Sequence, residues 1–395
     1  MKVFLVPTIV LSLAILSLSG IAAEELVKLD GESVQTTVEK ITPDGQVICE
    51  GIPEPIDLQN LRTIRTEAES PPLPPTISRV YILGGGVVSA ESVTIQTGET
   101  RIKGSGGNTW SFPMRHIRGI FMPAAADDAP SALSQFESML ESELRTDRAL
   151  AIQDEQVRTV RCALLGLREE SLTVNYKRQK RQIGRDKLLG VILARTADAP
   201  DRTGHCRVWL SDGSWFWARV LSMENGMLRA APFPDHTISV PWKRIARMQI
   251  MSERMIFASD LDPVSVEQGA IVTFPWSYKR DQNVFGQPLS LGGRTYARGL
   301  GMHAPCEVTY SVGDNYTLFS AVIGIDDSTG GKGNCVFRVR ADGEILFEKQ
   351  VDGGDDPQNI RVDIADRNRI SLQVDVGQNL DLGDAANWCE ARFIK

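Results

Sequence analysis

The chain has 395 residues, of which 42% are apolar and 24% charged, and its formal net charge is -7. This composition is typical of a globular protein with room for two or three domains, each with its own core. Neither half of the chain carries the strong basic field of a nucleic-acid-binding protein, so we expect no nucleic-acid partner.

Residues 1–23 have the features of a secretory signal peptide. Lys2 is followed by an apolar run, and small residues at 19–23 precede Glu24. We therefore expect an exported protein, periplasmic or extracellular. An uncleaved membrane anchor is the alternative, because the apolar run is close to the ~20 residues that span a bilayer. No later stretch is apolar enough to cross a membrane.

A short sequence motif, here called the phrase, occurs four times between residues 24 and 252. Each copy places two apolar residues three apart behind a polar one. The copies are NLRTI (60–64), HIRGI (116–120), KLLGV (187–191) and RIARM (244–248). The spacing from Leu61 to Ile117 and from Leu188 to Ile245 is nearly equal, and the middle spacing is longer. A regular period with one insertion indicates internal duplication.

The strands that precede each phrase alternate and are joined by Asp-Gly or Gly-rich turns, which predicts four small β-meanders. We assign units 1 and 2 to residues 24–122, a helical insertion or linker to 123–155, and units 3 and 4 to 156–252. The expected architecture is that of small SH3-like or Sm-like barrels. Each unit is too short to bury a large hydrophobic core by itself, so we expect the units to pack in pairs. The insertion holds one helix, with Ser131 as its cap and Phe136 on its apolar stripe, which we expect to separate the two pairs.

Four tryptophans gather in the fourth unit, namely Trp209, Trp215, Trp217 and Trp242. Trp215 and Trp217 share one strand face, which is compatible with a stacking platform. Core or inter-unit packing is the commoner role of such residues.

The basic cluster KRQKR (177–181) is expected to be the solvated turn of a hairpin, with an anion or surface contact as the alternative. The six cysteines are divided three and three between the two parts of the chain, and none has the CxxC spacing of a zinc site. We expect buried free thiols, although export would allow some of them to pair.

Residues 253–395 have a different pattern of apolar and polar residues. The later strands alternate strictly: Ile370, Leu372 and Val374 are separated by the polar Ser371 and Gln373. Runs of this kind between Asp-Gly turns predict a β-sandwich of two sheets, with one face of each strand in the interior.

Three segments of this part carry a family resemblance: RDQNVFGQPLSLGGRTYARGLGMHA (280–304), IGIDDSTGGKGNCVFRVRADGE (323–344) and DLGDAANWCEARFI (381–394). They resemble the NPCBM carbohydrate-binding module, a jelly-roll sandwich of the galactose-binding type. The resemblance covers only the last third of the chain. It implies binding of a galactose-like glycan.

A sugar-binding site needs an aromatic side chain on which the sugar ring stacks, here called the plate, and a few fixed polar groups. The candidate plate is Trp388, with packing in the core as the alternative. His303 is a hydrogen-bonding candidate that can instead hold a hairpin end. The full set of candidate sugar-binding residues is His303, Asp326, Asp327, Lys332, Asn334, Asp384, Asn387 and Trp388. Asp326 and Asp381 are candidate ligands for a structural calcium ion, but no EF-hand spacing is present. We expect no other cofactor.

The four histidines are scattered, and the chain has no HExxH, GxSxG or P-loop motif. We therefore expect a protein that is not an enzyme. The leading hypothesis is an exported carbohydrate-binding protein. The alternative is a structural or assembly protein of the cell envelope, with protein partners for both parts.

Overall fold

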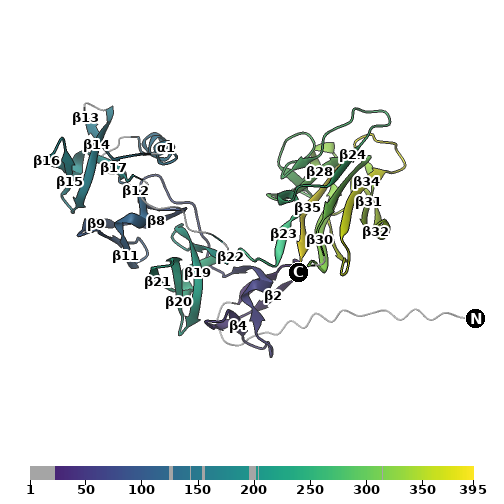
Figure 1. Cartoon of the computed structure of the whole chain (residues 1–395), viewed down its shortest axis with the longest axis horizontal. Coiled ribbons are helices and arrows are strands. Elements are labelled where there is room, and N and C mark those ends of the chain that lie inside the picture. The colour runs from purple at the N-terminus through teal and green to yellow at the C-terminus, as the bar shows by residue number, and fades with distance from the viewer. Residues whose placement is uncertain are drawn as a thin grey trace, which may run out of the picture.

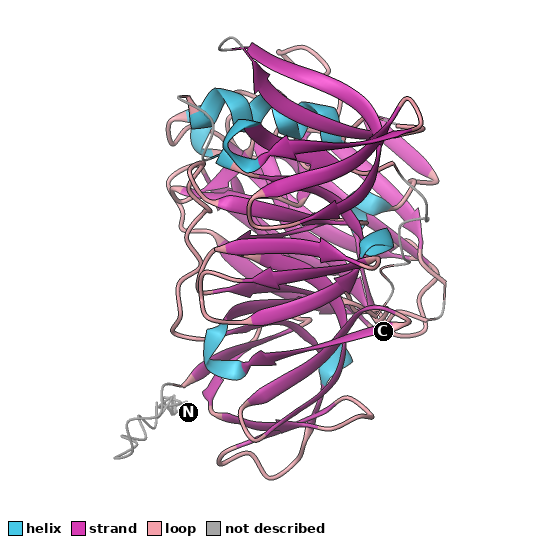
Figure 2. Ribbon diagram, turned by 90° about the vertical axis from the view of Figure 1, so that its left-hand side faces the viewer, coloured by secondary structure: helices cyan, strands magenta, loops and turns pink. Residues whose placement is uncertain are grey.

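The computed structural model describes residues 23–123, 128–142, 144–153, 156–194, 202, 204–313 and 315–395. Within these residues the chain is almost entirely β-strand, with one α-helix (Figures 1 and 2). The prediction of an all-β protein with one inserted helix is confirmed. The predicted signal peptide lies outside the described residues, apart from Ala23. No helix in the described part of the chain is long and apolar enough to cross a membrane.

The N-terminal part consists of four similar units. Their strands are β1 (Glu24–Lys28), β2 (Ser33–Thr36), β3 (Val38–Ile41), β4 (Gln46–Cys49), β5 (Ile56–Asp57) and β6 (Leu61–Arg65) in unit 1; β7 (Ser78–Ile82), β8 (Gly86–Ala90), β9 (Ser92–Gln96), β10 (Glu99–Lys103), β11 (Thr109–Pro113) and β12 (Ile117–Phe121) in unit 2; β13 (Asp147–Gln153), β14 (Gln156–Leu167), β15 (Ser171–Tyr176), β16 (Gln179–Gly184) and β17 (Leu188–Ile192) in unit 3; and β18 (Cys206–Leu210), β19 (Trp215–Glu224), β20 (Met227–Phe233), β21 (His236–Pro241) and β22 (Ile245–Ile250) in unit 4.

The recurring phrase has the same structure in every unit. Its first residue ends a 3-10 turn of three residues, and its other four residues begin the last strand, which pairs antiparallel with the first strand of its own unit. The apolar residue that begins the last strand is buried in each case, as Leu61, Ile117, Leu188 and Ile245 show. Pairing of the first and last strands closes each unit on itself, as in a small barrel.

The units are not ordered in space as they are in sequence. The last strand of unit 1, β6, pairs with the last strand of unit 4, β22, and β12 of unit 2 pairs with β17 of unit 3. Strand β19 of unit 4 pairs with β8 of unit 2. The spatial order is therefore 1–4–2–3 (Figure 1). The expected pairing of sequence neighbours 1 with 2 and 3 with 4 is wrong, because each closing strand uses its free edge to pair with the closing strand of another unit.

Helix α1 (Ala129–Leu140) covers the junction of units 2 and 3. Asp128, not Ser131, is its N-cap, and its carboxylate accepts a hydrogen bond from the Ser131 amide at 3.2 Å. Phe136 is fully buried, with its ring centroid 5.4 Å from that of Phe121 on β12. The helix therefore joins the two units that it was expected to separate. The range 123–155, expected as insertion or linker, also contains β13.

The C-terminal part is a sandwich of two antiparallel sheets, and successive strands from β28 to β35 mostly alternate between them, which is the jelly-roll pattern. The first sheet has the order β25-β28-β35-β30-β33, with β23 beside β35, and the second has the order β24-β29-β34-β31-β32. The strands of the whole C-terminal part are β23 (Met255–Phe257), β24 (Ser265–Gln268), β25 (Lys279–Arg280), β26 (Leu289–Leu291), β27 (Arg294–Tyr296), β28 (Gly299–His303), β29 (Cys306–Ser311), β30 (Leu318–Ile325), β31 (Asn334–Ala341), β32 (Glu344–Asp352), β33 (Gln358–Asp363), β34 (Arg369–Val376) and β35 (Ala385–Ile394). Strands β26 and β27 form a separate hairpin.

The sandwich is attached to unit 1 through the end of β35 near the C-terminus (Figure 1). Arg392 is buried there, and its Nε donates to the Leu29 carbonyl at 2.5 Å. Glu390 forms an ion pair with Arg62 of β6. Burial lowers the pKa of Arg392 to about 10, which leaves it charged at neutral pH. Polar contacts of this kind fix the sandwich against the repeats.

All six cysteines are buried free thiols, as expected. Burial raises the pKa of Cys206 and of Cys306 to about 12, so these thiols are neutral and unreactive at physiological pH.

Candidate functional site

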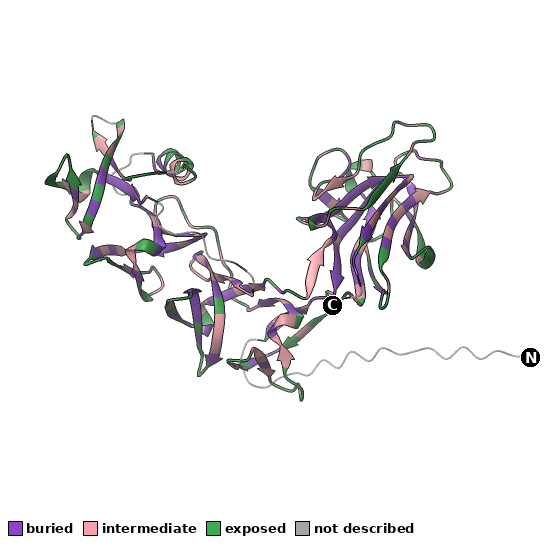
Figure 3. Ribbon diagram, viewed as in Figure 1, coloured by how far each residue is buried: buried purple, intermediate pink, exposed green. Residues whose placement is uncertain are grey.

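The polar residues predicted from the sequence lie largely at one end of the sandwich. His303 ends β28 and is paired with Ala385, which begins β35, and the Asp326 amide donates to the Ala385 carbonyl at 2.8 Å. The other end of β35 contacts unit 1, and seven residues of strand at about 3.3 Å each separate Ala385 from Arg392. We call the end with His303, Asp326 and Ala385 the distal rim. Its loops are largely exposed, whereas the strands below it are buried (Figure 3).

Trp388 is not part of the surface of the distal rim. It is fully buried in the core of the sandwich, with its ring centroid 5.2 Å from that of Phe337 and 6.0 Å from that of Phe319, both in edge-to-face arrangements. Side chains alternate along β35, so Trp388 points into the interior and Asn387 points to the outer face. The prediction that Trp388 stacks on a sugar is therefore corrected: in this structure no face of its indole is available.

Asp326 is the centre of a buried hydrogen-bond network. One carboxylate oxygen accepts from Asn283 Nδ2 at 3.0 Å and from the amide and hydroxyl of Ser328. The other accepts from Asn387 Nδ2 at 2.5 Å and from the Ser290 amide at 3.2 Å. Such a carboxylate is compensated by its donors. It ties the loop after β30 to the segment at 283–290.

Asp327 is exposed, yet both of its oxygens are also engaged. They accept from the amides of Gly292 at 2.8 Å and Gly293 at 2.9 Å, which form the turn of the β26–β27 hairpin. This hairpin covers the outer face of the first sheet, where Leu289 and Leu291 pack with Cys389. Asp327 therefore anchors a cover for the sheet.

Asn334 and Asp384 form a second buried pair. The Asn334 amide donates to Asp384 Oδ1 at 2.9 Å, and its side-chain amide donates to Asp352. Asp384 Oδ2 is buried with no hydrogen-bond partner. Burial raises the pKa of Asp384 to about 6. Asn334 and Asp384 thus join the loop before β31 to the start of β35.

His303 is only 5% exposed. Its Nδ1 lies 3.0 Å from the Ala304 carbonyl oxygen, to which it donates, and burial lowers the pKa of the imidazole, so His303 is neutral at pH 7. The backbone hydrogen bond anticipated as its alternative role is present. Lys332 is exposed on the loop between β30 and β31.

Asp381 fixes the loop at 271–273. Its carboxylate accepts from the amides of Ile271, Val272 and Thr273 at 3.0–3.1 Å and from the Thr273 hydroxyl at 2.6 Å. Burial alone would raise the pKa of Asp381, but these donors lower it below its usual value.

The two candidate calcium ligands do not fit a cation. The oxygens of Asp326 and Asp381 face N–H and O–H donors, whereas calcium needs six to eight oxygen ligands facing inward. Among the described residues, no group of three or more His, Cys, Asp or Glu side chains is placed to hold a metal ion.

An aromatic pair missed by the sequence reasoning lies beside these loops. The rings of Trp276 and Phe285 pack edge to face with centroids 5.2 Å apart, and the two side chains are 38% and 43% exposed. Trp276 follows the loop held by Asp381, and the Phe285 amide donates to Asn283 Oδ1 at 3.0 Å. Lys279, three residues after Trp276, pairs with Gly301, two residues before His303. The sequence signal was aromatic residues in a segment without strand periodicity.

Comparison with known proteins finds a family match for the C-terminal part. Residues 254–394 match the model of the NPCBM/NEW2 domain. A protein of Renibacterium salmoninarum, named as an endo-alpha-N-acetylgalactosaminidase, is 39% identical over 110 residues, which are 28% of this chain and 7% of that protein. Alpha-1,3-galactosidase B of Akkermansia muciniphila is 34% identical over 73 residues, 18% of this chain and 9% of that protein. The chain thus spans less than a tenth of these relatives.

Two solved structures are also similar. A CBM51 module from a Clostridium perfringens GH95 protein, in complex with methyl-galactose, is 25% identical with a TM-score of 0.33, covering 35% of this chain and 99% of that one. The tandem CBM51 modules of a family 98 glycoside hydrolase of Streptococcus pneumoniae are 15% identical with a TM-score of 0.32, covering 91% and 88%. TM-scores of this size do not by themselves establish a shared fold. The family match supports a carbohydrate-binding module: residues 254–394, about a third of this chain, match the NPCBM/NEW2 domain.

Proposed function

We propose that the chain is an exported, non-catalytic carbohydrate-binding protein whose C-terminal domain binds galactose-type glycans at the distal rim. The family match supports glycan binding, and the names of both relatives and the methyl-galactose in one similar structure favour galactose. The features of residues 1–23 favour export.

The observation that carries this proposal is the exposed pair of Trp276 and Phe285. A sugar ring presents an apolar C–H face that packs on an aromatic ring, while its hydroxyls bond to fixed polar groups. The two rings lie on segments that Asp381 and Asn283 hold through buried hydrogen bonds. They are therefore preorganised, which limits the entropy lost on binding.

Among the residues predicted from the sequence, the exposed Lys332 is the proposed direct contact, and His303, which is buried and bonded to the Ala304 carbonyl, is proposed to support the rim. Asp326, Asn387, Asn334 and Asp384 are proposed to support the loops, because their polar groups are buried and largely engaged with protein donors. Asp327 is proposed to hold the hairpin cover. Trp388 contributes to the site only as part of the core beneath it.

The hydrogen bonds that the rim carboxylates accept from the protein also support a non-catalytic role. A glycosidase needs two carboxyl groups that face the scissile bond from opposite sides. At the distal rim, Asp326, Asp327 and Asp381 instead accept hydrogen bonds from the protein itself. We therefore expect no turnover of chromogenic glycosides.

Binding of methyl-β-galactoside and methyl-β-glucoside by the full chain tests the proposal, measured by calorimetry. We expect selective binding of the galactoside, and a loss of affinity of about tenfold in Trp276→Ala, since an aromatic contact is worth roughly 0.5–1.5 kcal/mol beyond the apolar area that it buries. Ile345→Ala, at an apolar residue 47% exposed on β32 of the other sheet, is the matched control. Unchanged affinity in Trp276→Ala would show that the rim pair does not hold the sugar.

A specific observation favours the second candidate, an envelope assembly protein. Several apolar side chains near the distal rim are more than 45% exposed: Ile271, Val272, Phe274, Leu380 and Leu382. Exposed apolar groups that lie together are typical of protein contacts. Under this candidate no glycoside binds, and the full chain self-associates in sedimentation experiments in a manner abolished by Phe274→Ser.

A further inference from the structure

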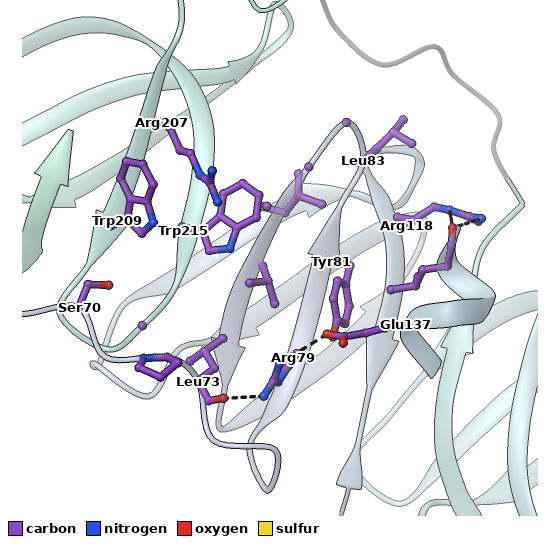
Figure 4. A pocket seen from close by; sticks show the side chains of 18 of the residues that line it. Ser70, Leu73, Arg79, Tyr81, Leu83, Arg118, Glu137, Arg207, Trp209 and Trp215 are labelled. Carbon is purple, nitrogen blue, oxygen red and sulfur yellow. Dashed lines mark hydrogen bonds and ion pairs between the residues drawn. The ribbon is translucent and has the colours of Figure 1, made fainter. Parts of the chain in front are cut away.

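A hollow of about 850 Å³ lies at the junction of units 2 and 4 (Figure 4). Units 2 and 4 lie apart from the C-terminal sandwich and its distal rim (Figure 1). One wall is formed by β18 and β19, with Arg207, Trp209 and Trp215. The other is formed by β7, β8 and helix α1, with Tyr81 and Glu137. The linker between units 1 and 2 closes one side. The hollow exists only because units 2 and 4, which are separated in sequence, pair through β8 and β19.

Arg207 is the most unusual group of this hollow. Its guanidinium carbon lies 3.8 Å from the ring centroid of Trp215 and 4.6 Å from that of Trp209. Its Nε is buried with no hydrogen-bond partner. No ion pair within the described residues includes Arg207, although a partly buried cation normally has a counter-charge. The stacking on indoles compensates the charge only in part.

The opposite wall does not supply the missing anion. Among the residues that the structure describes, Glu137 is the one acidic residue that lines the hollow. It accepts from the Tyr81 hydroxyl at 2.7 Å and lies 3.7 Å from Arg79 Nη1, so its charge is already engaged. Arg118 also lines the hollow and donates to the Leu140 and Ser142 carbonyls. Among the described lining residues, Glu137 is thus engaged with Arg79 and Tyr81, and no acidic side chain pairs with Arg207.

Glycines keep the mouth of the hollow open. Gly84, Gly85 and Gly86 form the turn between β7 and β8, all with positive φ. A Cβ on Gly86 would lie 3.1 Å from the backbone of Phe216, and one on Gly85 would lie 3.5 Å from the Trp217 ring. The turn therefore packs directly against the strand that carries the indoles, without side chains that would fill the space.

We propose that this hollow is a second binding site, for an anionic saccharide that bears a carboxylate or a sulfate. The anionic group pairs with the outer N–H groups of Arg207, and a sugar ring lies against the accessible edges of the half-buried Trp209 and Trp215. The volume lies within the ~300–1,000 Å³ of small-ligand sites. Planar guanidinium groups bind carboxylate and sulfate-like oxygens in two parallel hydrogen bonds. The site is independent of the distal rim.

The test measures binding of two probes to the full chain by equilibrium dialysis: tetragalacturonate and a sulfated carrageenan tetrasaccharide, with cellotetraose as the neutral comparison. We expect at least one anionic probe to bind and cellotetraose not to bind. Arg207→Met should weaken the anionic probe about tenfold or more. Arg181→Met, which removes the same charge from an exposed residue on β16, should leave the affinity unchanged. Selectivity between the probes identifies carboxylate or sulfate as the preferred group.

Arg207→Lys keeps the charge but loses the planar fork, and it provides a folded variant if Arg207→Met unfolds. We expect Arg207→Lys to weaken binding with little change in the thermal midpoint, and Trp276→Ala to leave this binding unchanged. Equal losses in Arg207→Met and Arg181→Met would show non-specific charge attraction and overturn the proposal. So would unaltered binding by Arg207→Lys, tighter binding of poly-glutamate than of either saccharide, or the absence of binding by the unaltered chain.

Discussion

Replacement of Trp388 by alanine separates a core role from a sugar-stacking role. Trp388 is fully buried and packs edge to face on Phe319 and Phe337. A Trp→Ala change at such a site removes the buried indole and leaves a cavity, which costs about 3–5 kcal/mol. For a domain of this size, that loss lowers the midpoint of thermal unfolding by roughly 10 °C.

The assay is hydrogen exchange of the full chain, followed on peptides from β30 and β35. Trp388 lies on β35 and is paired with Ile323 of β30, so the free energy of opening of the amides of both strands should fall by the amount above, whereas peptides from units 2 and 3 should keep their protection. Trp388→Phe, which retains an aromatic ring, should lose less than half as much. If Trp388→Ala kept full protection in β35 but lost sugar binding, the indole would have to be a ligand contact, and the core assignment would be refuted.

Three further predictions concern other parts of the structure. Burial raises the pKa of Asp384 to about 6, so the neutral carboxyl is favoured in the folded state; its stabilising effect is complete below about pH 4 and is lost as the pH rises through 6. Asp384→Asn should therefore flatten the denaturation profile between pH 4 and 7 and raise stability at pH 7 by about 2 kcal/mol; an unchanged pH profile would contradict this. Gly190→Ala should destabilise the junction of units 2 and 3 by about 1–3 kcal/mol, because its Cβ would lie 2.6 Å from both the Ile120 carbonyl and the Phe136 ring; Gly354→Ala, with open space around it, is the control in chemical denaturation. Asp381→Ala should leave the amides of 271–273 unpaired, speed their hydrogen exchange and weaken galactoside binding about tenfold; retention of both protection and affinity would disconnect this loop from the site.

Local features of the sequence were sufficient for the units themselves. The phrase around Leu61 and its three copies led to the prediction of four units, and in the structure each copy follows a 3-10 turn and begins the strand that pairs with the first strand of its segment. The alternation around Leu372 predicted the sandwich in the same way. The family segments also located the distal rim, since His303, Asp326 and Asp384 lie on neighbouring strand ends.

The roles of individual residues at the rim were harder to predict. Trp388 and Asn387 are neighbours in sequence, and only the register of β35 decides that the indole enters the core and the amide reaches Asp326. From the sequence, a carboxylate such as Asp327 is a candidate ligand-binding group. Only the structure reveals that it accepts hydrogen bonds from the amides of Gly292 and Gly293. Trp276 had no periodic pattern around it, because its loop is held by Asp381, more than a hundred residues away.

The sequence by itself determined most of the β-strands, the recurring phrase, the helix of the described insertion and the family resemblance of the last third, because these depend on alternation, turn residues and short motifs. Only the tertiary structure decided the order 1–4–2–3, in which β22 pairs with β6 and β8 with β19. Any free strand edge offers the same hydrogen-bonding groups, so the choice of partner depends on side-chain packing between distant segments. The hollow around Arg207 follows from that choice and has no signature in the linear sequence.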